Sequence, residues 1–280
     1  MAVTDHPLVG LGYAGATSTR KFVRIAGDVV ADESAEVADE VPVALVYNGR
    51  SHVVVMATPC DLEDLAAGFT RTEGIVDEPA QLERVEIVRA SHGIEVQMEI
   101  PGWAADRLEA RARGMVSRTG CGLCGVETIS DLLRMPPEVS AALRVGAAAL
   151  WRASAEMSHQ QTINARTNAV HAAGWSTVDG AVRIVREDVG RHNALDKVLG
   201  ALDRRGQPAA AGFLVVTSRA SYEMVQKAAT CGVELLAAVS RPTGLAIRFA
   251  SAAGMTLVGL VRGTSANVYC GRERISSSAH

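Results

Sequence analysis

Residues 213–261 read FLVVTSRASYEMVQKAATCGVELLAAVSRPTGLAIRFASAAGMTLVGLV, and this stretch decides the fold. Three apolar runs, at 213–217, 233–239 and 256–261, alternate with two segments of helical character, 221–230 and 243–253. Strands that alternate with helices form right-handed crossovers, which place the strands parallel in one sheet. Uninterrupted apolar runs such as FLVV are typical of strands buried on both faces. We therefore expect an α/β fold built on a parallel or mixed sheet.

The rest of the chain predicts two domains. Upstream of 213, residues 169–175 and 181–186 predict a hairpin through Asp179-Gly180, followed by a helix at 191–202. Residues 141–151 and 155–163 predict two further helices. We assign 127–274 to this larger domain and 275–280 to a tail.

Residues 21–116 predict a smaller α+β domain. Apolar runs at 43–47 and 52–56 flank Asn48-Gly49, a strong hairpin signal, and a second hairpin joins 82–89 to 94–100. Asp61 is a good N-cap for a helix at 62–72, and residues 104–113 predict a short charged helix. Residues 1–20 lack periodicity and predict a flexible tail.

Composition and charge narrow the class of protein. Of 280 residues, 48% are hydrophobic and 21% charged, which is ordinary for a soluble globular protein. A net charge of -3 argues against a general nucleic-acid binder. No apolar run approaches the roughly 18 residues of a membrane span, and the N-terminus does not resemble a secretory signal. These features predict a cytoplasmic protein without a nucleic-acid or membrane partner.

The segment Gly120-Cys121-Gly122-Leu123-Cys124-Gly125 is the chemically most informative motif, in an expected mobile loop at 117–126. A C-x-x-C pair suits dithiol redox exchange, half of a zinc site, or a persulfide carrier whose second thiol resolves the first. A thioredoxin-like motif would follow a strand, whereas this one follows a charged helix. A zinc site needs a second pair of ligands, and the deaminase zinc motifs are missing. The other cysteines, at 60, 231 and 270, are expected to be small buried residues.

Polar residues follow each of the three predicted parallel strands. Arg219, Arg241 and Arg262 come just after the apolar runs, each with hydroxyl side chains nearby. Ligands of open parallel sheets bind beyond the carboxyl ends of the strands, and guanidinium groups pair well with phosphate. The three arginines therefore predict a site for a phosphate-bearing ligand; the alternative is that they are solvated or paired with carboxylates.

A second polar cluster, EDVGRHNALDK at 187–197, precedes the first parallel strand. His192 is a candidate to bind an anion or to transfer a proton, with Lys197 as a weaker ligand candidate. Equally, Asp188 could cap the helix and His192 could be a core histidine.

Five segments together resemble the FdhD/NarQ family, the sulfurtransferases required for active formate dehydrogenase. They are GCGLCG (120–125), EDVGRHNALDKVLG (187–200), SRASYEMVQKA (218–228), RPTGLAIRFA (241–250) and GMTLVGLVRGTSANVY (254–269), and the resemblance covers roughly residues 22–271. It implies a cytidine-deaminase-like three-layer C-terminal domain without the deaminase zinc, a smaller N-terminal α+β domain, and a cytoplasmic homodimer without a structural metal.

The resemblance also implies a mechanism. Sulfur passes from a cysteine desulfurase to a persulfide on Cys121, with Cys124 as its partner, and then to the molybdenum (or tungsten) bis(molybdopterin guanine dinucleotide) cofactor of formate dehydrogenase. The family's cofactor-binding segment falls on Leu260, Val261, Arg262, Gly263, Thr264 and Ser265. Alternatives are a cofactor-delivery chaperone without sulfur chemistry, a C-x-x-C redox protein, or a nucleotide-binding regulatory module.

The chain departs from the usual family pattern at three positions. Asn168 and Ser218 stand where glycine is common, and Arg241 stands where a small residue is common. Bulk at the first two positions is expected to narrow the ligand crevice, and Arg241 to add a phosphate contact.

Overall fold

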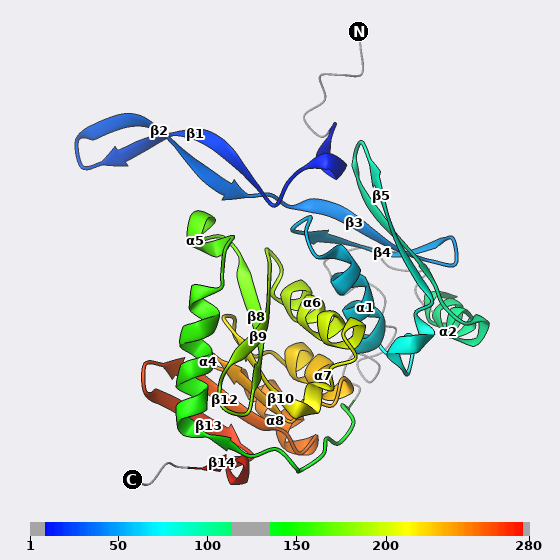
Figure 1. Ribbon diagram of the computed structural model, residues 1–280. Coiled ribbons are helices and arrows are strands. Elements are labelled where there is room, and N and C mark those ends of the chain that lie inside the picture. The colour runs from blue at the N-terminus through cyan, green and yellow to red at the C-terminus, as the bar shows by residue number, and fades with distance from the viewer. Residues whose placement is uncertain (1–8, 114–134, 277–280) are drawn as a thin grey trace.

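The computed structural model describes residues 9–113 and 135–276 (Figure 1). A six-stranded mixed sheet, in the order β13-β12-β11-β10-β8-β9, is the centre of the second half. Three neighbouring strands are parallel: β10 (Gly212–Val216), β11 (Leu235–Ala238) and β12 (Thr256–Arg262). The other three join the sheet antiparallel: β8 (His171–Thr177), β9 (Val182–Asp188) and β13 (Ser265–Cys270). The expected α/β class and mixed sheet are thus confirmed.

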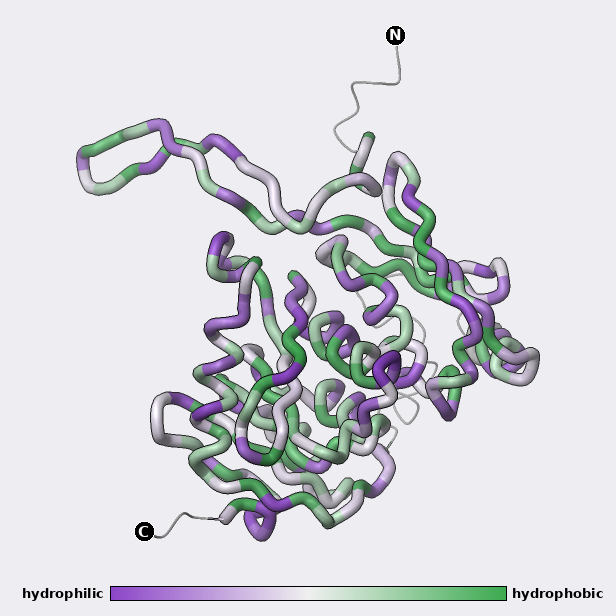
Figure 2. Tube along the Cα trace, in the orientation of Figure 1, coloured by the Kyte–Doolittle hydropathy of each residue, from purple (hydrophilic) through white to green (hydrophobic). Residues whose placement is uncertain are grey.

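Helices cover both faces of this sheet and make three layers (Figure 1). On one face, α6 (Arg191–Arg204), α7 (Tyr222–Thr230) and α8 (Gly244–Ala252) pack against residues such as Leu214 and Val216. On the other face, α4 (Ala147–His159) packs against Phe213 and Val215. Successive residues of a strand point to opposite faces, so the uninterrupted run FLVV fills both cores. Hydrophobic residues accordingly concentrate in these strands (Figure 2).

The N-terminal part is a four-stranded sheet in the order β4-β3-β6-β5. Its strands are β3 (Val41–Tyr47), β4 (Arg50–Ala57), β5 (Arg84–Ala90) and β6 (Gly93–Glu99). The two predicted hairpins are both present, and Asn48 and Gly49 have the positive φ angles of a tight hairpin turn. Helix α1 (Leu62–Thr72) and helix α2 (Gly102–Arg113) contribute apolar side chains to the core beneath the sheet.

Asp61 is the N-cap residue of α1 as predicted, but its side chain does not cap the helix. Asp61 has a left-handed conformation with φ 51° and forms no side-chain capping bond. Its carboxylate lies 3.4 Å from the guanidinium of Arg186 on β9 instead. Asp61 therefore contributes an ion pair between the two halves of the protein rather than a side-chain cap.

Both predicted tails are partly structured. Residues 11–13 form a 3-10 helix (Leu11–Tyr13) beside the N-terminal sheet, and residue 17 begins a long hairpin of β1 (Thr17–Ala26) and β2 (Val29–Ala38). We name this hairpin the arm, because it projects away from the body (Figure 1). At the other end, β14 (Ile275–Ser276) pairs with β7 (Val145–Gly146). The tail prediction is therefore wrong for residues 11–13, 17–20 and 275–276.

The predicted helices at 141–151 and 155–163 are in fact one helix, α4, which begins at Ala147. The chain before it runs extended because the backbone N–H of Leu143 donates to the Glu234 carboxylate at 2.9 Å. Arg274 pairs with the same carboxylate and donates to the Ser140 carbonyl, so distant residues hold this segment. The remaining short elements are α5 (Asn164–Thr167) and three 3-10 turns, Pro79–Gln81, Ala209–Ala211 and Arg272–Arg274.

The two halves meet where α1 packs against α6. A Cβ atom on Gly68 would lie 1.8 Å from the carbonyl oxygen of Asp196, and one on Gly200 would lie 1.9 Å from that of Asp64. The two glycines therefore allow the helix backbones to approach directly. This contact fixes the smaller domain against the sheet whose edge carries the candidate site.

Candidate functional site

The three predicted arginines lie at one edge of the six-stranded sheet. Arg219 and Arg241 follow the parallel strands β10 and β11, and Arg262 ends β12. Backbone hydrogen bonds join the loops after these strands: Thr243 N–H donates to the Ala220 carbonyl at 3.0 Å and Leu260 N–H to the Ser240 carbonyl at 3.2 Å. The sheet thus brings together the three loops that the sequence pattern places at its carboxyl edge.

The side chains of Arg219, Arg241 and Arg262 are all exposed. Among the residues that the structure describes, none of the three forms an ion pair with a carboxylate. The only polar contact of these guanidinium groups there is a 3.4 Å bond from Arg262 Nε to the Val239 carbonyl. The edge therefore carries uncompensated positive charge, which favours a phosphate-bearing ligand. We name it the arginine edge.

The helix that follows β10 adds backbone donors to the arginine edge. The N-cap residue of α7 is Ser221, whose hydroxyl forms no capping bond; its Oγ is buried without a hydrogen-bond partner in the described part of the chain. By contrast, Thr243 caps α8 by accepting from Ala246 N–H at 3.2 Å. The first N–H groups of an uncapped helix favour anions. The α7 terminus is therefore better placed than that of α8 to receive a ligand oxygen.

The predicted segment Leu260–Ser265 contains an irregular strand end. Leu260 has a φ of 54°, unusual for a residue other than glycine, and the pairing of β12 with β13 shifts register between Gly259 and Arg262. Val261 is buried in the core below the sheet, so only its backbone can meet a ligand, whereas Arg262, Gly263, Thr264 and Ser265 are exposed. The bulge at Leu260 thus turns Arg262 and the residues after it toward solvent.

His192 lies at the start of α6 and bridges to α7 rather than standing alone. Its Nε2 is 2.9 Å from Oε2 of Glu223, and both side chains are about one-third exposed. The hydrogen bond from His192 is the main reason that the pKa of Glu223 is lowered. The structure therefore places His192 in a contact between two helices that both begin near the arginine edge.

Sequence reasoning missed His171, which begins β8. Because β8 runs antiparallel to β10, its first residues lie beside the end of β10, where Thr217 N–H donates to the Ala172 carbonyl. Burial lowers the pKa of His171, and the nearby charges of Arg191 and His192 lower it further. A neutral imidazole thus lies beside the cationic edge. Only the strand direction, which the sequence did not predict, could have identified it.

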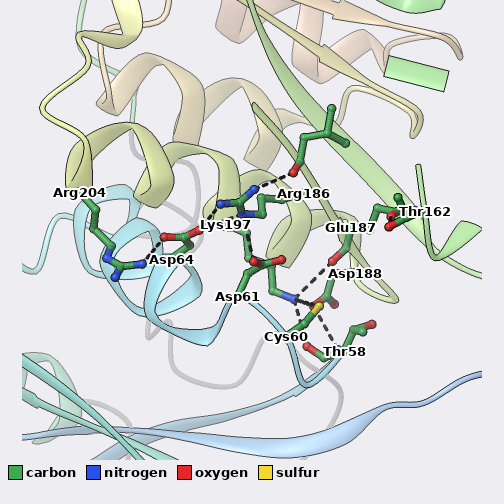
Figure 3. Close-up of polar contacts among 11 residues, drawn as sticks. Thr58, Cys60, Asp61, Asp64, Thr162, Arg186, Glu187, Asp188, Lys197 and Arg204 are labelled. Atoms are coloured by element: carbon green, nitrogen blue, oxygen red, sulfur yellow. Dashed lines mark hydrogen bonds and ion pairs between the residues drawn. The ribbon is translucent and has the colours of Figure 1, made fainter. Parts of the chain in front are cut away.

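Lys197 is not a ligand-binding residue, and that prediction is wrong. Its side chain is fully buried, and its ammonium donates to Asp188 at 2.6 Å and to the Thr58 carbonyl at 3.0 Å (Figure 3). The Asp188 carboxylate also accepts from the backbone N–H groups of Thr58 at 3.1 Å and Gly190 at 2.8 Å. A buried charge is tolerated when it is paired and hydrogen-bonded in this way. Lys197 and Asp188 therefore join the two halves of the protein.

A second buried group in the same segment has the same role. Asp196 accepts from the Thr72 hydroxyl of α1 at 2.8 Å and from the Lys227 ammonium of α7 at 3.0 Å. Lys227 also donates to Glu73 at 2.7 Å. We refer to these contacts and those of Lys197 with Asp188 and Thr58 as the domain lock.

Cys121 and Cys124 lie outside the described residues. The three described cysteines are poor nucleophiles, because burial raises the pKa of Cys60 to about 11 and that of Cys231 to about 12, and also raises that of Cys270. The thiolate, not the thiol, is the nucleophile. The described cysteines therefore leave Cys121 and Cys124 as the candidates for sulfur chemistry.

Two absences can be stated for residues 9–113 and 135–276. In these ranges no group of three or more histidine, cysteine, aspartate or glutamate side chains is arranged to hold a metal ion. None of the helices in them combines the length and apolar character that a bilayer crossing requires.

Comparison with known proteins agrees with this picture. The model of the FdhD/NarQ family matches residues 38–276. A Bordetella petrii relative named "Sulfur carrier protein FdhD" is 49% identical over 255 residues, which cover 90% of this chain and 92% of the relative. A Cupriavidus necator relative of the same name is 49% identical, with 87% and 85% covered. A Desulfotalea psychrophila crystal structure described as a formate dehydrogenase accessory protein is 25% identical with a TM-score of 0.75, covering 93% of this chain and 100% of that one.

Proposed function

This chain belongs to the FdhD/NarQ family, and we propose that it carries sulfur as a persulfide on Cys121 to a molybdenum cofactor held by its guanine nucleotide at the arginine edge. Sulfur transfer in the service of formate dehydrogenase is the role of its relatives, and it is the role of this chain at the level of the family. What we propose beyond this is the persulfide on Cys121, the molybdenum cofactor as the sulfur acceptor, and the residues that bind that cofactor.

The observation that carries the proposal is the arginine edge itself. Three exposed guanidinium groups follow three neighbouring strands and have no carboxylate partner within the described chain. A nucleotide end with its phosphates matches this charge, and the uncapped start of α7 offers backbone donors beside it. Arg219, Arg241 and Arg262 would bind the phosphates, with Gly263, Thr264 and Ser265 beside them. Leu260 would position this segment, and Val261 would contribute its backbone.

The two cysteines are the only groups of this protein that the proposed sulfur-transfer steps require. The Cys121 thiolate attacks the outer sulfur of a persulfide on a cysteine desulfurase; a new S–S bond forms, the donor's S–S bond breaks, and the donor leaves as a thiolate. The Cys124 thiolate then attacks the inner sulfur of the Cys121 persulfide. A Cys121–Cys124 disulfide forms, hydrosulfide is released to the metal of the bound cofactor, and an external thiol later reduces the disulfide.

Intact-mass measurement after incubation with a cysteine desulfurase and cysteine tests these steps. The protein should gain one sulfur atom that a reductant removes. Cys121→Ala should not gain it, whereas Cys124→Ala should gain it and fail to release hydrosulfide. Cys60→Ala is the matched control and should behave as the unaltered protein, because its thiol is held protonated. Sulfur loading of Cys121→Ala equal to that of the unaltered protein would refute the assignment.

Calorimetric titration with GDP tests the binding half. Loss of one charged phosphate contact costs about 1.5–3 kcal/mol, so Arg262→Ala should weaken GDP binding about 10- to 100-fold. The matched control is Arg183→Ala. Arg183 is also exposed, but it lies near the start of β9, away from the arginine edge. The other end of β9, at Asp188, is the one that pairs with His171 beside that edge. Equal affinities for the two variants would place the nucleotide elsewhere.

The partners that complete the proposal are a cysteine desulfurase as donor, formate dehydrogenase as recipient, and a second copy of the chain in a homodimer. A reducing cytoplasm suits a working thiol pair. If a variant lacking both Cys121 and Cys124 still activated formate dehydrogenase, the protein would instead deliver the cofactor without sulfur chemistry.

A further inference from the structure

The arm contacts the body of the protein at its base and exposes apolar side chains to solvent near its tip. At the base, Arg166 on α5 pairs with Glu36 at 2.9 Å, and the Ser18 hydroxyl donates to Asp39 at 3.0 Å. Near the tip, Val23, Ile25, Val29 and Val30 have exposed fractions between 57% and 73%. Figure 1 shows the arm extending past the body, and Figure 2 shows hydrophobic residues at its far end.

Such a ribbon needs a partner. Two strands alone form a marginally stable hairpin in water, because they have no third strand or helix to cover an apolar face. Within the described residues the arm is a two-stranded sheet of its own, so the outer edges of β1 and β2 have no further strand beside them there. Three of the four, Val23, Ile25 and Val30, share one face of the arm, because Ile25 pairs with Val30 and successive residues of a strand alternate between faces. Large apolar side chains gathered on one face of a projecting ribbon mark an interaction surface.

The charges of the arm indicate what that partner is. The ten residues of β1 include Arg20, Lys21 and Arg24 and no acid, whereas the ten of β2 include Asp32, Glu33 and Glu36 and no base. Arg24 pairs with Glu33 across the arm at 3.4 Å, Arg20 lies 3.9 Å from Asp39, and Glu36 bonds Arg166. These exposed pairs are individually weak and can exchange partners. Lys21 and Asp32 share the face of Ile25 and Val30, and neither forms an ion pair within the described residues. One basic and one acidic side chain beside the same apolar patch make this face complementary to another copy of itself.

We propose that the arm is the dimerisation element of this protein, and that it stacks on the arm of a second copy with β1 of each over β2 of the other. A two-fold axis parallel to the arms produces this arrangement. It brings the apolar tips together and places the basic strand of each copy over the acidic strand of the other. The inference rests on the homodimer included in the proposed function and adds its site.

The size of the contact predicts how it behaves. A ten-residue strand is about 33 Å long, and a two-stranded ribbon with its side chains is roughly 10 Å wide, so stacked arms bury about 700 Å² in total. Stable interfaces usually bury about 1,200–2,000 Å², so the arm contact is small. It should therefore be sensitive to protein concentration and, because charges contribute, should weaken as salt increases.

A charge-swap experiment on the full chain tests the proposal. Lys21→Glu leaves only acidic charges on the apolar face of the arm, and Asp32→Lys leaves only basic charges on that face near the tip; Glu36 and the anchored base stay intact. Sedimentation at about 0.15 M salt, where charges more than about 8 Å apart are screened, measures assembly. The unaltered protein should dimerise, each variant alone should dimerise at least tenfold more weakly, and their equimolar mixture should regain a dimer containing one copy of each.

A second pair of variants tests the apolar tip. Ile25→Ser with Val30→Ser should weaken the dimer without lowering the thermal melting midpoint by more than a few degrees. Val178→Ser, at an exposed position in the β8–β9 turn, is the matched control and should leave the dimer unchanged.

Several outcomes would overturn the proposal, and they differ from failure of the sulfur chemistry. Charge variants that dimerise as tightly as the unaltered protein, or a mixture that fails to regain the dimer, would refute the role of the arm while leaving a dimer in place. An unaltered protein that is monomeric at micromolar concentration would refute both arm and dimer. Sulfur loading of Cys121, measured by intact mass, is independent of all these results.

Discussion

Replacing Gly200 by alanine tests the close approach of helices α1 and α6. Gly200 on α6 faces the backbone of α1, and an added Cβ would lie 1.9 Å from the carbonyl oxygen of Asp64 and 2.5 Å from the amide nitrogen of Gly68. Both neighbours are backbone atoms in a helix, so neither can rotate away. The two helices must separate for the alanine to fit.

The separation can be worked out from the distances. Cβ contacts below 3.0 Å essentially do not occur, so α6 must retreat by at least 3.0 minus 1.9, or 1.1 Å. An equal shift would lengthen the bond between Thr72 and Asp196 from 2.8 Å to about 3.9 Å, beyond hydrogen-bond range. Overpacking costs about 1–3 kcal/mol, and loss of a hydrogen bond to a charged group costs about another 1.5–3 kcal/mol. We therefore expect Gly200→Ala to lower the free energy of unfolding by about 2.5–6 kcal/mol.

Urea unfolding followed by circular dichroism measures this loss. Gly102→Ala is the matched control, because Gly102 begins α2 and an added Cβ there meets no atom within 4 Å. Alanine is the better helix former by about 1 kcal/mol, so the control should be neutral or slightly stabilising. A free energy of unfolding for Gly200→Ala within about 1 kcal/mol of the unaltered protein would show that the helices do not approach as closely as described.

Three further predictions concern the charged groups. Lys197→Met leaves Asp188 buried without its cation and should cost about 3–5 kcal/mol in urea unfolding, whereas the exposed Arg84→Ala should cost about 0–1 kcal/mol; equal losses would contradict the buried pair. Burial raises the pKa of Asp203 to about 6, above its unfolded value of 3.8, so its charged form opposes folding at neutral pH. Asp203→Asn should therefore raise the melting temperature at pH 7, with the gain shrinking as the pH falls through 6 toward 4; a gain that grows in acid would refute this. His192→Ala should move the carboxyl titration of Glu223 toward higher pH in an NMR titration, because the hydrogen bond from His192 is the main cause of its lowered pKa; an unmoved titration would show that the two groups do not interact.

The fold was predictable where the signal is local. Asn48-Gly49 between two apolar runs predicts its hairpin because few other residues adopt the required backbone. The alternation over residues 213–261 predicts the parallel strands for a similar reason. The arm was missed because its strands show no alternation of apolar and polar residues. The start of α4 was placed too early because the Glu234 contact that holds residue 143 comes from far along the chain.

The site was predictable where topology alone decides it. Parallel neighbouring strands bring Arg219, Arg241 and Arg262 to one edge whatever the details of packing. The roles of His192 and Lys197 were not predictable, because their partners Glu223 and Thr58 lie in other elements. The cysteine pair lies outside the described residues, so its assignment stays a prediction.

The domain lock changes how a match to the segment at 187–197 should be interpreted in a related sequence. This string contributes most to recognising the family in a sequence, yet Asp188, Asp196 and Lys197 all act in assembly of the fold. A relative that had lost sulfur chemistry would still need these residues to hold its halves together. A match at this string therefore reports that the two halves can assemble, and does not by itself report sulfur chemistry.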